Sequence, residues 1–381
     1  MTHNAVADMQ YMQQALELAR QGTGYVSPNP LVGCVIVKDG QVVGRGYHQR
    51  FGGPHAEVYA LQEAGTRASG ATLYVNLEPC SHTGKTPPCA ESVVQAGIRR
   101  VVMALRDPNP LVAGSGLARL QQAGISVTVG IGEAEARQLN EAFLKYITTQ
   151  CPFVTLKCAI SLDGKIATRT GASRWITGDL ARTEVHRLRH ASDAIVVGIG
   201  TVLQDNPLLT TRLPDRRGVQ ALRVIVDSHL RLPLQAQVAQ VTAECRTLVA
   251  TTSRADAVRQ QQLEEQGVEI LSLPAYDDGY VNLEALWHCL GTRGVASVLV
   301  EGGATLSATL LRRRLVDKVL FFVAPKIIGG DGISVIGACG VETMGQVIGL
   351  QHLTGQRLGD DVVLQAYLSR SDEHTRSREG G

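Results

Sequence analysis

The sequence predicts an α/β protein of two domains, on the basis of its length, its periodicity and a change of pattern near its middle. Its 381 residues suffice for two domains, because one domain commonly holds about 100–200 residues. Segments with apolar residues at helical spacing alternate with short apolar runs typical of strands, and this alternation indicates a sheet with helices on both faces. A new pattern starts at Pro152, so we expect domains over residues 1–150 and 151–369.

The first element is a helix that ends at Gly22, because Met9, Met12, Leu16 and Ala19 recur at helical spacing before it. The other elements expected in this half are, in order, two strands within 31–47 that turn at 38–40, a helix over 55–67, a strand over 72–77, a helix over 89–96, a strand over 100–105, a helix over 116–123, a strand over 126–129 and a helix over 133–147.

The second half opens with a strand that starts at Phe153. Further strands are predicted near 194–198, 223–227, 247–251, 268–273, 297–301, 318–323 and 362–368. Helices are predicted over 179–190, 254–266, 283–291 and 305–313. The polar, glycine-ended segment 370–381 is predicted to be a disordered tail.

Composition excludes several classes of protein. A hydrophobic fraction of 44% and a charged fraction of 19% are typical of a folded core rather than of a disordered chain. The formal net charge of +2 argues against a dedicated nucleic-acid binder. The sequence has neither an apolar run of about 18 residues nor a secretory signal, so we expect no membrane partner. Eight scattered cysteines, several within apolar runs, indicate buried thiols and a cytoplasmic location.

His55, Cys80 and Cys89 have the composition of a zinc site. One imidazole and two thiolates leave the fourth position open, as in catalytic zinc sites, where the metal lowers the pKa of a bound water to about 7. Cys89 follows two prolines and begins a predicted helix, whose positive end favours a thiolate. Glu57 stands two residues after His55, close enough to move protons without binding the metal. A structural zinc site, with Ser81 and His82 nearby, and a disulfide between the two cysteines are the alternatives.

The pattern H-x-E followed by P-C and a second Cys is typical of zinc nucleobase deaminases, although the two cysteines of that signature are separated by two residues and those here by eight. The loop PCSHTGKTPPC resembles the RibD family of bifunctional riboflavin-biosynthesis enzymes. Four further segments extend this resemblance: SPNPLVGCVIV at 27–37, GYHQRFGGPHAE at 46–57, NLEPC at 76–80 and DPNP at 107–110. The resemblance implies a cytidine-deaminase-like α/β/α sandwich, catalytic Glu57, zinc ligands His55, Cys80 and Cys89, and substrate contacts from Asn29, His48, Lys85, Asp107 and Asn109. Lys85 and His48 would suit the phosphate and Asn29 the base edge, whereas ordinary turns would explain Asn29, Asp107 and Asn109 equally well.

The second half lacks a G-x-G-x-x-G after its first strand, so a Rossmann domain is not indicated. Four motifs, at 156–167, 173–178, 197–212 and 300–306, instead place small, hydroxyl or charged residues just after predicted strands. Ligands bind at these carboxyl ends in open α/β sheets. The pair Gly302-Gly303 before a predicted helix could offer backbone N–H groups to a phosphate.

These motifs resemble the RibD reductase domain, which implies a dihydrofolate-reductase-like fold that uses NADPH. By this resemblance the nucleotide contacts come from Ala159, Trp175, Thr201, Asp205, Ser228 and the run Gly303, Ala304, Thr305, Leu306, Ser307, Ala308, Thr309. The sugar-phosphate contacts come from Ser173, Arg189, Leu209, Arg212 and Glu301, with Lys157 as a further candidate. Arg189 could instead be a solvated helix residue, while the guanidinium of Arg212 suits a phosphate.

The NADPH 2′-phosphate would need a cation or several donors, which Thr252, Ser253 and Arg254 could supply at a predicted helix start. The alternative is that Ser253 caps the helix and Arg254 faces solvent.

Two catalytic domains on one chain imply consecutive reactions. The resemblance implies zinc-dependent deamination of 2,5-diamino-6-(5-phosphoribosylamino)pyrimidin-4(3H)-one, then NADPH-dependent reduction of 5-amino-6-(5-phosphoribosylamino)uracil, by a homo-oligomer (dimer or tetramer). Two rival functions are a single-activity deaminase of nucleosides or RNA with a regulatory second half, and a zinc-stabilised scaffold without activity.

Overall fold

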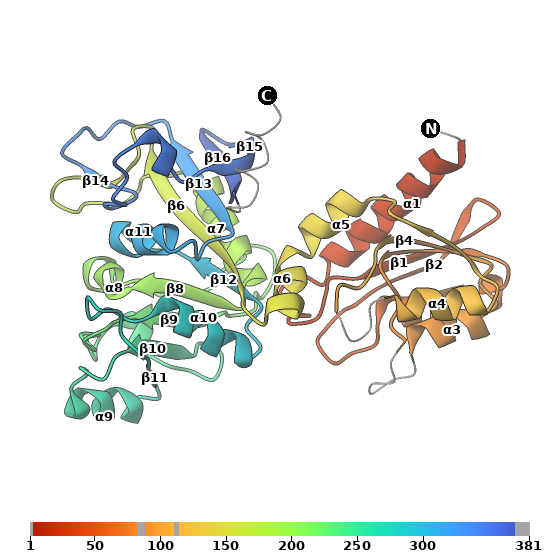
Figure 1. The fold of residues 1–381 in the computed structure, drawn as a ribbon, viewed down its shortest axis with the longest axis horizontal. Helices are drawn as coiled ribbons and strands as arrows, with labels where there is room; N and C mark the ends of the chain where they lie inside the picture. The colour runs from red at the N-terminus through yellow and green to blue at the C-terminus, as the bar shows by residue number, and fades with distance from the viewer. Residues whose placement is uncertain (1–2, 82–87, 110–113, 370–381) are drawn as a thin grey trace. The chain divides into compact units, whose positions relative to one another are not determined.

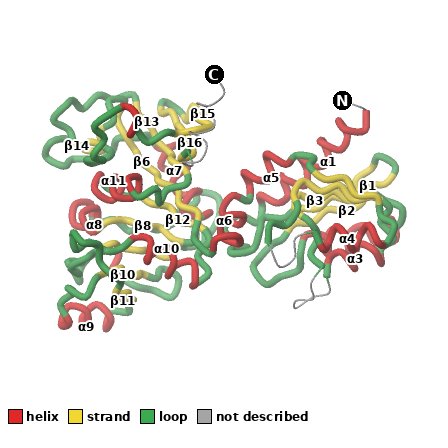
Figure 2. Tube along the Cα trace, in the orientation of Figure 1, coloured by secondary structure: helices red, strands yellow, loops and turns green. Residues whose placement is uncertain are grey.

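Two separate sheets carry most strands of the two halves in the computed structural model (Figures 1 and 2). The structure describes residues 3–81, 88–109 and 114–369, so Lys85 and the tail 370–381 lie outside the described residues. The chain divides into two compact units, Met1–Gln150 and Cys151–Gly381. No helix among the described residues has the length and apolar character needed to cross a membrane.

The first unit contains a five-stranded sheet in the order β2-β1-β3-β4-β5. β1 pairs antiparallel with β2 and β3, while β3, β4 and β5 run parallel. The strands are β1 (Gly33–Lys38), β2 (Gln41–Tyr47), β3 (Thr72–Leu77), β4 (Arg100–Leu105) and β5 (Ser126–Val129). The helices are α1 (His3–Arg20), α2 (Ala56–Ala64), α3 (Cys89–Gln95), α4 (Ser115–Gln122), α5 (Glu133–Leu139) and α6 (Glu141–Thr149), with a 3₁₀ turn η1 (Gly65–Ala68).

Alternate residues of these strands enter two different cores. Ile36 and Leu73 belong to a cluster that includes apolar residues of α2, α3 and α4. Val35 and Tyr74, one position away, belong to a second cluster that includes residues of α1 and α5. Because successive strand residues point to opposite faces of a sheet, the helices cover both faces, and the predicted α/β/α sandwich is confirmed.

The helix predicted over 133–147 is divided into α5 and α6 at Asn140. The Asn140 side chain accepts a hydrogen bond from the N–H of Leu31 at 2.8 Å and donates one to the carbonyl oxygen of Leu31 at 3.0 Å. These bonds join Asn140 to the segment before β1 and stabilise the non-helical backbone at that residue, where φ is −108°. The single long helix was therefore a wrong prediction.

The second unit contains a nine-stranded sheet in the order β11-β10-β9-β8-β12-β6-β13-β16-β15. The strands from β11 to β13 run parallel, and β16 and β15 are added antiparallel at one edge. The strands are β6 (Phe153–Ser161), β8 (Ala194–Gly198), β9 (Leu222–Val226), β10 (Thr247–Thr251), β11 (Glu269–Ser272), β12 (Ser297–Val300), β13 (Lys318–Ala324), β15 (Leu350–Leu358) and β16 (Asp361–Leu368). A separate two-stranded sheet pairs β7 (Lys165–Ala167) with β14 (Ile333–Ser334).

Helices cover both faces of this sheet, as the predicted α/β class requires (Figure 1). They are α7 (Asp179–Ala191), α8 (Ile199–Asp205), α9 (Ala257–Glu265), α10 (Leu283–Thr292) and α11 (Ala304–Arg312), with 3₁₀ turns η2 (Gln237–Ala239) and η3 (Met344–Gln346). α8, β7, β14 and β15 were not predicted. The helix predicted from 254 begins at Ala257, and its N-cap is Asp256, whose side chain accepts from Arg259 N at 2.8 Å; Ser253 is not its cap.

The central strands β8, β12 and β6 are neighbours, and their carboxyl ends lie at one edge of the sheet because they are parallel. Residues 199–205 and 301–303 follow β8 and β12 directly. This topology brings three of the four predicted ligand motifs of the second half to the same edge.

Candidate functional site

His55, Cys80 and Cys89 converge at one end of the first sheet. His55 is the N-cap of α2, Cys80 follows β3 by three residues, and Cys89 begins α3. The Nδ1 atom of His55 lies 3.6 Å from Cys80 Sγ and 3.2 Å from Cys89 Sγ. The three potential ligand atoms lie within 4.8 Å of one another, a grouping that one zinc ion could bridge.

The chemistry of this group fits a catalytic zinc ion better than the alternatives. Cys80 and Cys89 are free thiols rather than a disulfide. Within the described ranges, no fourth His, Cys, Asp or Glu joins the three, which leaves a coordination position for water or substrate. The hydrogen bond between the two thiols lowers the pKa of Cys80 and raises that of Cys89, so the pair favours one thiolate, the form that binds metals.

Glu57 lies in the first turn of α2, two residues after His55. Its side chain is buried, and its Oε2 atom has no hydrogen-bond partner among the described residues. Burial raises the pKa of Glu57 above its ordinary value, which favours a carboxyl group that can both take and return a proton. A buried polar atom without a partner requires an explanation, and a ligand at the zinc position would supply one.

Two glycines of β2 fix the position of α2. A Cβ atom on Gly44 would lie 2.2 Å from the carbonyl oxygen of Ala60, so only glycine allows this approach of helix and strand. Gly46 makes the same kind of contact with the first turn of α2. The strand backbone therefore sets the place of His55 and Glu57 directly.

Asn29 and His48 lie beside the zinc-ligand group. His48 is 2% exposed, and its ring stands edge-on to that of His55 with centroids 5.5 Å apart. Its Nδ1 atom bonds the carbonyl oxygen of Pro54 at 2.9 Å, and its Nε2 atom lies 3.1 Å from Asn29 Nδ2. The carbonyl requires a proton on Nδ1, so Nε2 accepts from the Asn29 amide and the ring is neutral. Burial lowers the pKa of His48 accordingly.

Asp107 and Asn109 follow β4 in a short turn. The Asp107 side chain accepts from Asn109 N at 2.9 Å, and the backbone N–H of Asp107 donates to the buried carboxylate of Glu78 at 3.1 Å. Glu78 stands two residues before Cys80. Its side chain therefore joins residues 78–81, which we call the zinc-ligand turn, to the turn that carries two predicted substrate residues. Sequence reasoning did not select Glu78.

The second unit contains a cavity of about 540 Å³ at the carboxyl ends of its central strands. It is lined by five of the predicted nucleotide residues, namely Ala159, Trp175, Thr201, Asp205 and Gly303. It is also lined by all five predicted sugar-phosphate residues, Ser173, Arg189, Leu209, Arg212 and Glu301, and by Lys157. The structure thus brings together residues that are up to 146 positions apart in the sequence (157 to 303).

The other predicted nucleotide residues do not line this cavity. Ser228 is buried, and its hydroxyl accepts from Val281 N at 3.0 Å. Ala304, Thr305, Leu306 and Thr309 lie along α11 behind Gly303, and Ser307 and Ala308 face the core. Thr252, Ser253 and Arg254 also lie outside it, where Thr252 donates to the carbonyl oxygen of Ser228 at 2.8 Å.

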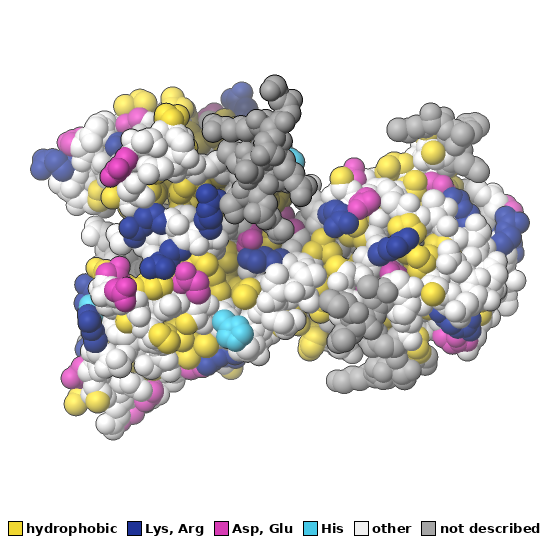
Figure 3. Space-filling view, in the orientation of Figure 1, with side chains coloured by type: hydrophobic (Ala, Val, Ile, Leu, Met, Phe, Trp, Pro, Cys, Tyr) yellow, Lys and Arg dark blue, Asp and Glu magenta, His cyan; other side chains and the backbone are white. Residues whose placement is uncertain are grey.

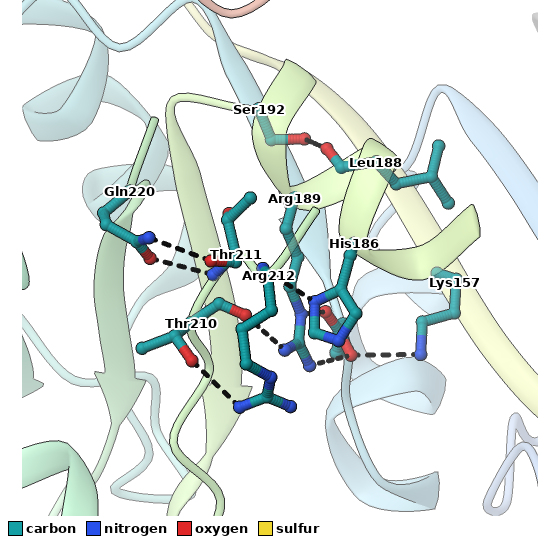
Figure 4. Close-up of polar contacts among 10 residues, drawn as sticks. Lys157, His186, Leu188, Arg189, Ser192, Thr210, Thr211, Arg212 and Gln220 are labelled. Carbon is teal, nitrogen blue, oxygen red and sulfur yellow. Dashed lines mark hydrogen bonds and ion pairs between the residues drawn. The ribbon is translucent and has the colours of Figure 1, made fainter. Parts of the chain in front are cut away.

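A buried ion cluster forms one wall of the cavity (Figure 4). Glu301 accepts from Arg189 Nε at 2.6 Å and Nη2 at 3.0 Å, and lies 3.0 Å from Lys157 Nζ. Burial alone would raise the pKa of Glu301, but the charges of Lys157 and Arg189 outweigh it and hold this pKa well below its usual range. Glu301 is therefore ionised, and Arg189 is not the solvated helix residue that its sequence position allowed.

Arg212 differs from Arg189 in its exposure and its partners. Its side chain is exposed, its Nη1 donates to the Thr210 hydroxyl at 3.1 Å, and its backbone N–H donates to His186 Nδ1 at 3.3 Å. In Figure 4 its guanidinium extends beside Thr210, away from the Arg189 ion pair. No ion pair joins Arg212 to a described carboxylate, so its charge is available to an anionic ligand.

Sequence reasoning missed three cavity residues of α7, namely Val185 and two basic residues. Arg182 and His186 line the cavity together with Arg189, and their spacings of four and three residues place all three on one helix face. This periodicity of basic residues was the available signal. The guanidinium of Arg182 lies 4.6 Å from the ring centroid of Trp175, whose side chain is 63% exposed.

Elsewhere on the face seen in Figure 3, basic and acidic side chains are interspersed on both units.

Comparison with known proteins gives consistent matches for both halves. Residues 6–105 match the cytidine and deoxycytidylate deaminase zinc-binding region, and residues 152–364 match the RibD C-terminal domain. The riboflavin biosynthesis protein RibD of Actinobacillus pleuropneumoniae is 43% identical over 360 residues, which are 94% of this chain and 95% of that protein.

Two solved structures resemble the whole chain. RibD of Acinetobacter baumannii, form 1, has a TM-score of 0.86 and 41% identity, and the match covers 96% of this chain and 100% of that one. A Thermotoga maritima protein described as a diaminohydroxyphosphoribosylaminopyrimidine deaminase and 5-amino-6-(5-phosphoribosylamino)uracil reductase has a TM-score of 0.83 and 37% identity, with the same coverage of 96% and 100%.

Proposed function

The chain belongs to the RibD family, and on that premise we propose the substrates of its two sites and the residues that act on them. It is a bifunctional enzyme of riboflavin biosynthesis with a zinc-dependent deaminase domain and an NADPH-dependent reductase domain. We assign deamination to residues 1–150 and reduction to residues 151–369, since each range contains its own sheet and its own cores.

The first substrate is 2,5-diamino-6-(5-phosphoribosylamino)pyrimidin-4(3H)-one. The observation that carries this assignment is the convergence of His55, Cys80 and Cys89 beside a buried Glu57 oxygen that has no described partner. Zinc, when bound by the three ligands, lowers the pKa of water. The Glu57 carboxylate takes the proton that water loses as the new C–O bond forms, and returns it to the amino nitrogen as the C–N bond breaks and ammonia leaves.

The predicted substrate residues of the first site have different parts in this proposal. Asn29 contacts the base edge, and neutral His48 holds its amide group through the 3.1 Å contact. Asp107 and Asn109 contact the ribose, and Lys85 contacts the phosphate. The buried, neutral ring of His48 suits positioning of Asn29 better than contact with a dianion.

The second substrate is 5-amino-6-(5-phosphoribosylamino)uracil, the product of the first reaction. NADPH, when bound, would supply a hydride to C1′ of the ring-opened imine form of the ribose, and a proton taken up from solvent at the imine nitrogen would complete the ribitylamino product. The exposed guanidinium of Arg212 binds the phosphate, since it has no carboxylate partner in the described part of the chain. Glu301, held by Arg189 and Lys157 at 2.6–3.0 Å, contacts the sugar hydroxyls. Ala159, Trp175, Thr201, Asp205 and Gly303 surround the nucleotide.

The enzyme is a homo-oligomer in this proposal, with a dimer as the simplest case. β15 is an edge strand of the nine-stranded sheet, and apolar side chains near it are exposed, with Leu353 at 68% and Met344 at 87%. Exposed apolar residues on a sheet edge favour association with a second chain. Light scattering after size exclusion should give a mass above that of one 40.8 kDa chain.

One incubation tests the two activities together. With zinc and the diaminopyrimidine substrate but no NADPH, ammonia and the phosphoribosylamino-uracil should accumulate. Addition of NADPH should consume that intermediate and produce the ribitylamino compound in equal amount to the NADPH oxidised. Ammonia release without any NADPH oxidation would indicate a single-activity deaminase, and no turnover in either arm would indicate a zinc-stabilised scaffold.

A further inference from the structure

The carboxylate of Glu78 joins three segments of the deaminase unit. It is 5% exposed and stands between the end of β3 and the zinc ligand Cys80. Its Oε2 atom accepts from the backbone N–H groups of Asp107 at 3.1 Å and Gly114 at 3.3 Å, and its Oε1 atom accepts from Leu117 N at 2.8 Å. One side chain thus receives three backbone donors from the chain that follows β4.

The same chain segment packs against the zinc-ligand turn so closely that its backbone leaves no room for a side chain at residue 116. A Cβ atom on Gly116 would lie 2.0 Å from the carbonyl oxygen of Pro79, so the first turn of α4 contacts the residue before Cys80 directly. The hydroxyls of Ser81 and Ser115 lie 2.5 Å apart on the other side of Cys80. Contacts with the zinc-ligand turn therefore fix the position of α4 and of the 107–109 turn.

We infer that Glu78 is a positioning residue for deamination, which holds the Asp107–Asn109 turn at a fixed distance from the metal ligands. This inference rests on the proposed function, in which that turn binds the ribose of the substrate. A substrate whose ribose lies on this turn can also place its pyrimidine in the metal site, and so bind tightly, only while the two turns keep their spacing. Three N–H groups directed at one buried carboxylate are strongly oriented, and no other described side chain bonds both Asp107 N and Leu117 N.

Glu78→Gln tests the inference with a minimal change of shape. An amide keeps one accepting oxygen but directs an NH₂ group at a donor, so either Leu117 N or the Asp107 and Gly114 pair loses its acceptor. We expect the KM for the diaminopyrimidine to rise about tenfold or more while kcat changes by less than about threefold, because binding rather than chemistry is lost. Glu78→Asp keeps two oxygens on a shorter side chain and should recover part of the affinity.

Glu91→Gln is the matched control. Glu91 on α3 pairs with Arg119 on α4 at 2.8 Å, so it also anchors α4, but it bonds neither Asp107 nor the zinc-ligand turn. This variant should keep the wild-type KM. Zinc content and the reductase rate, measured on the same preparations, should match those of the wild type and show that each variant is folded.

Asn109→Ala separates this inference from the proposed function. If that variant keeps the wild-type KM, the turn does not bind substrate, and both proposals fail. If Asn109→Ala raises the KM and Glu78→Gln does not, only the role of Glu78 is refuted. Combination of the two changes should raise the KM by less than the product of the single effects, since both act through one turn; full multiplicativity would also refute it.

Discussion

The backbone of Gly46 lies directly against Ala56: a Cβ atom on residue 46 would stand 2.2 Å from the Ala56 carbonyl oxygen. That oxygen belongs to the first turn of α2, between the zinc ligand His55 and Glu57. The distance between strand and helix is thus set by the absence of a side chain at this position.

Gly46→Ala should therefore displace α2 and weaken the zinc site. We expect overpacking to cost about 1–3 kcal/mol of unfolding free energy, with loss of zinc at lower chelator concentration than in the wild type. The measurements are denaturant unfolding and zinc release to a chelator. Gly200→Ala, in α8 of the other unit with no atom within 4 Å of its Cβ, is the control and should be neutral. Unchanged zinc retention in Gly46→Ala would contradict the contact.

Glu57→Gln should abolish proton transfer while the metal stays bound. The amide has nearly the same shape but cannot take a proton from water, so the deamination rate should fall about 10²–10⁴-fold. Ammonia release gives the rate and metal analysis gives the zinc content. The reductase rate of the same protein, assayed with the deaminated intermediate, should not change. A wild-type rate of deamination would exclude Glu57 as the proton carrier.

Arg212→Ala should weaken binding of the phosphorylated substrate in the reductase cavity. Loss of a charge-assisted contact of about 1.5–3 kcal/mol predicts an increase in KM of about ten- to a hundredfold or more, and less dependence of KM on salt. Arg217→Ala is the matched control, because Arg217 is exposed, pairs with Glu244 and does not line the cavity. Equal effects of both variants would show that the change reports general surface charge.

Asp163→Asn should remove a pH-dependent part of the stability of the second unit. Asp163 accepts from the Ser161 hydroxyl at 2.6 Å and from Gly329 N at 2.7 Å, and these bonds lower its pKa from 3.8 to about 2. Because the folded-state pKa is depressed, the stabilisation is complete above about pH 4 and is lost as the pH falls through about 2. The difference in thermal midpoint between wild type and variant should vanish in that window; a constant difference at all pH values would contradict it.

The two proposed domains should work apart. Residues 1–150 alone should deaminate the first substrate, and residues 151–381 alone should reduce the intermediate supplied to them, since the chain divides at Gln150. Circular dichroism checks that each fragment is folded. Two folded but inactive fragments would show that the sites share residues across the boundary.

The sequence predicted the central strands well and the peripheral ones poorly. β8 and β12 are buried on both faces and read as continuous apolar runs. β15 exposes most of its residues and is a strand only because β16 pairs with it, which no local pattern indicates. The break at Asn140 depends on its bonds to Leu31, 109 positions away, so the helical periodicity on either side gave no sign of it.

The same limit applies to the sites. The residue types and spacing of His55, Cys80 and Cys89 indicate a metal site from the sequence alone. The position of Ser307 on the buried face of α11, by contrast, depends on how that helix packs. Glu78 has no local signal at all, because its three donors lie 29–39 positions further along the chain. Residue type and motif therefore indicate candidate ligands, whereas the groups that hold those candidates in place become visible only in the fold.

The two tryptophans give the protein a built-in optical reporter. The chain has two: Trp175 lines the reductase cavity with 63% of its surface exposed, and Trp287 lies in the core with 4% exposed. Both belong to the second unit. Tryptophan fluorescence, excited selectively, therefore does not report unfolding of the deaminase unit. Within the second unit, quenching by added iodide should reach Trp175 first, and bound dihydronicotinamide should protect it, while the emission of Trp287 shifts to longer wavelength only on unfolding.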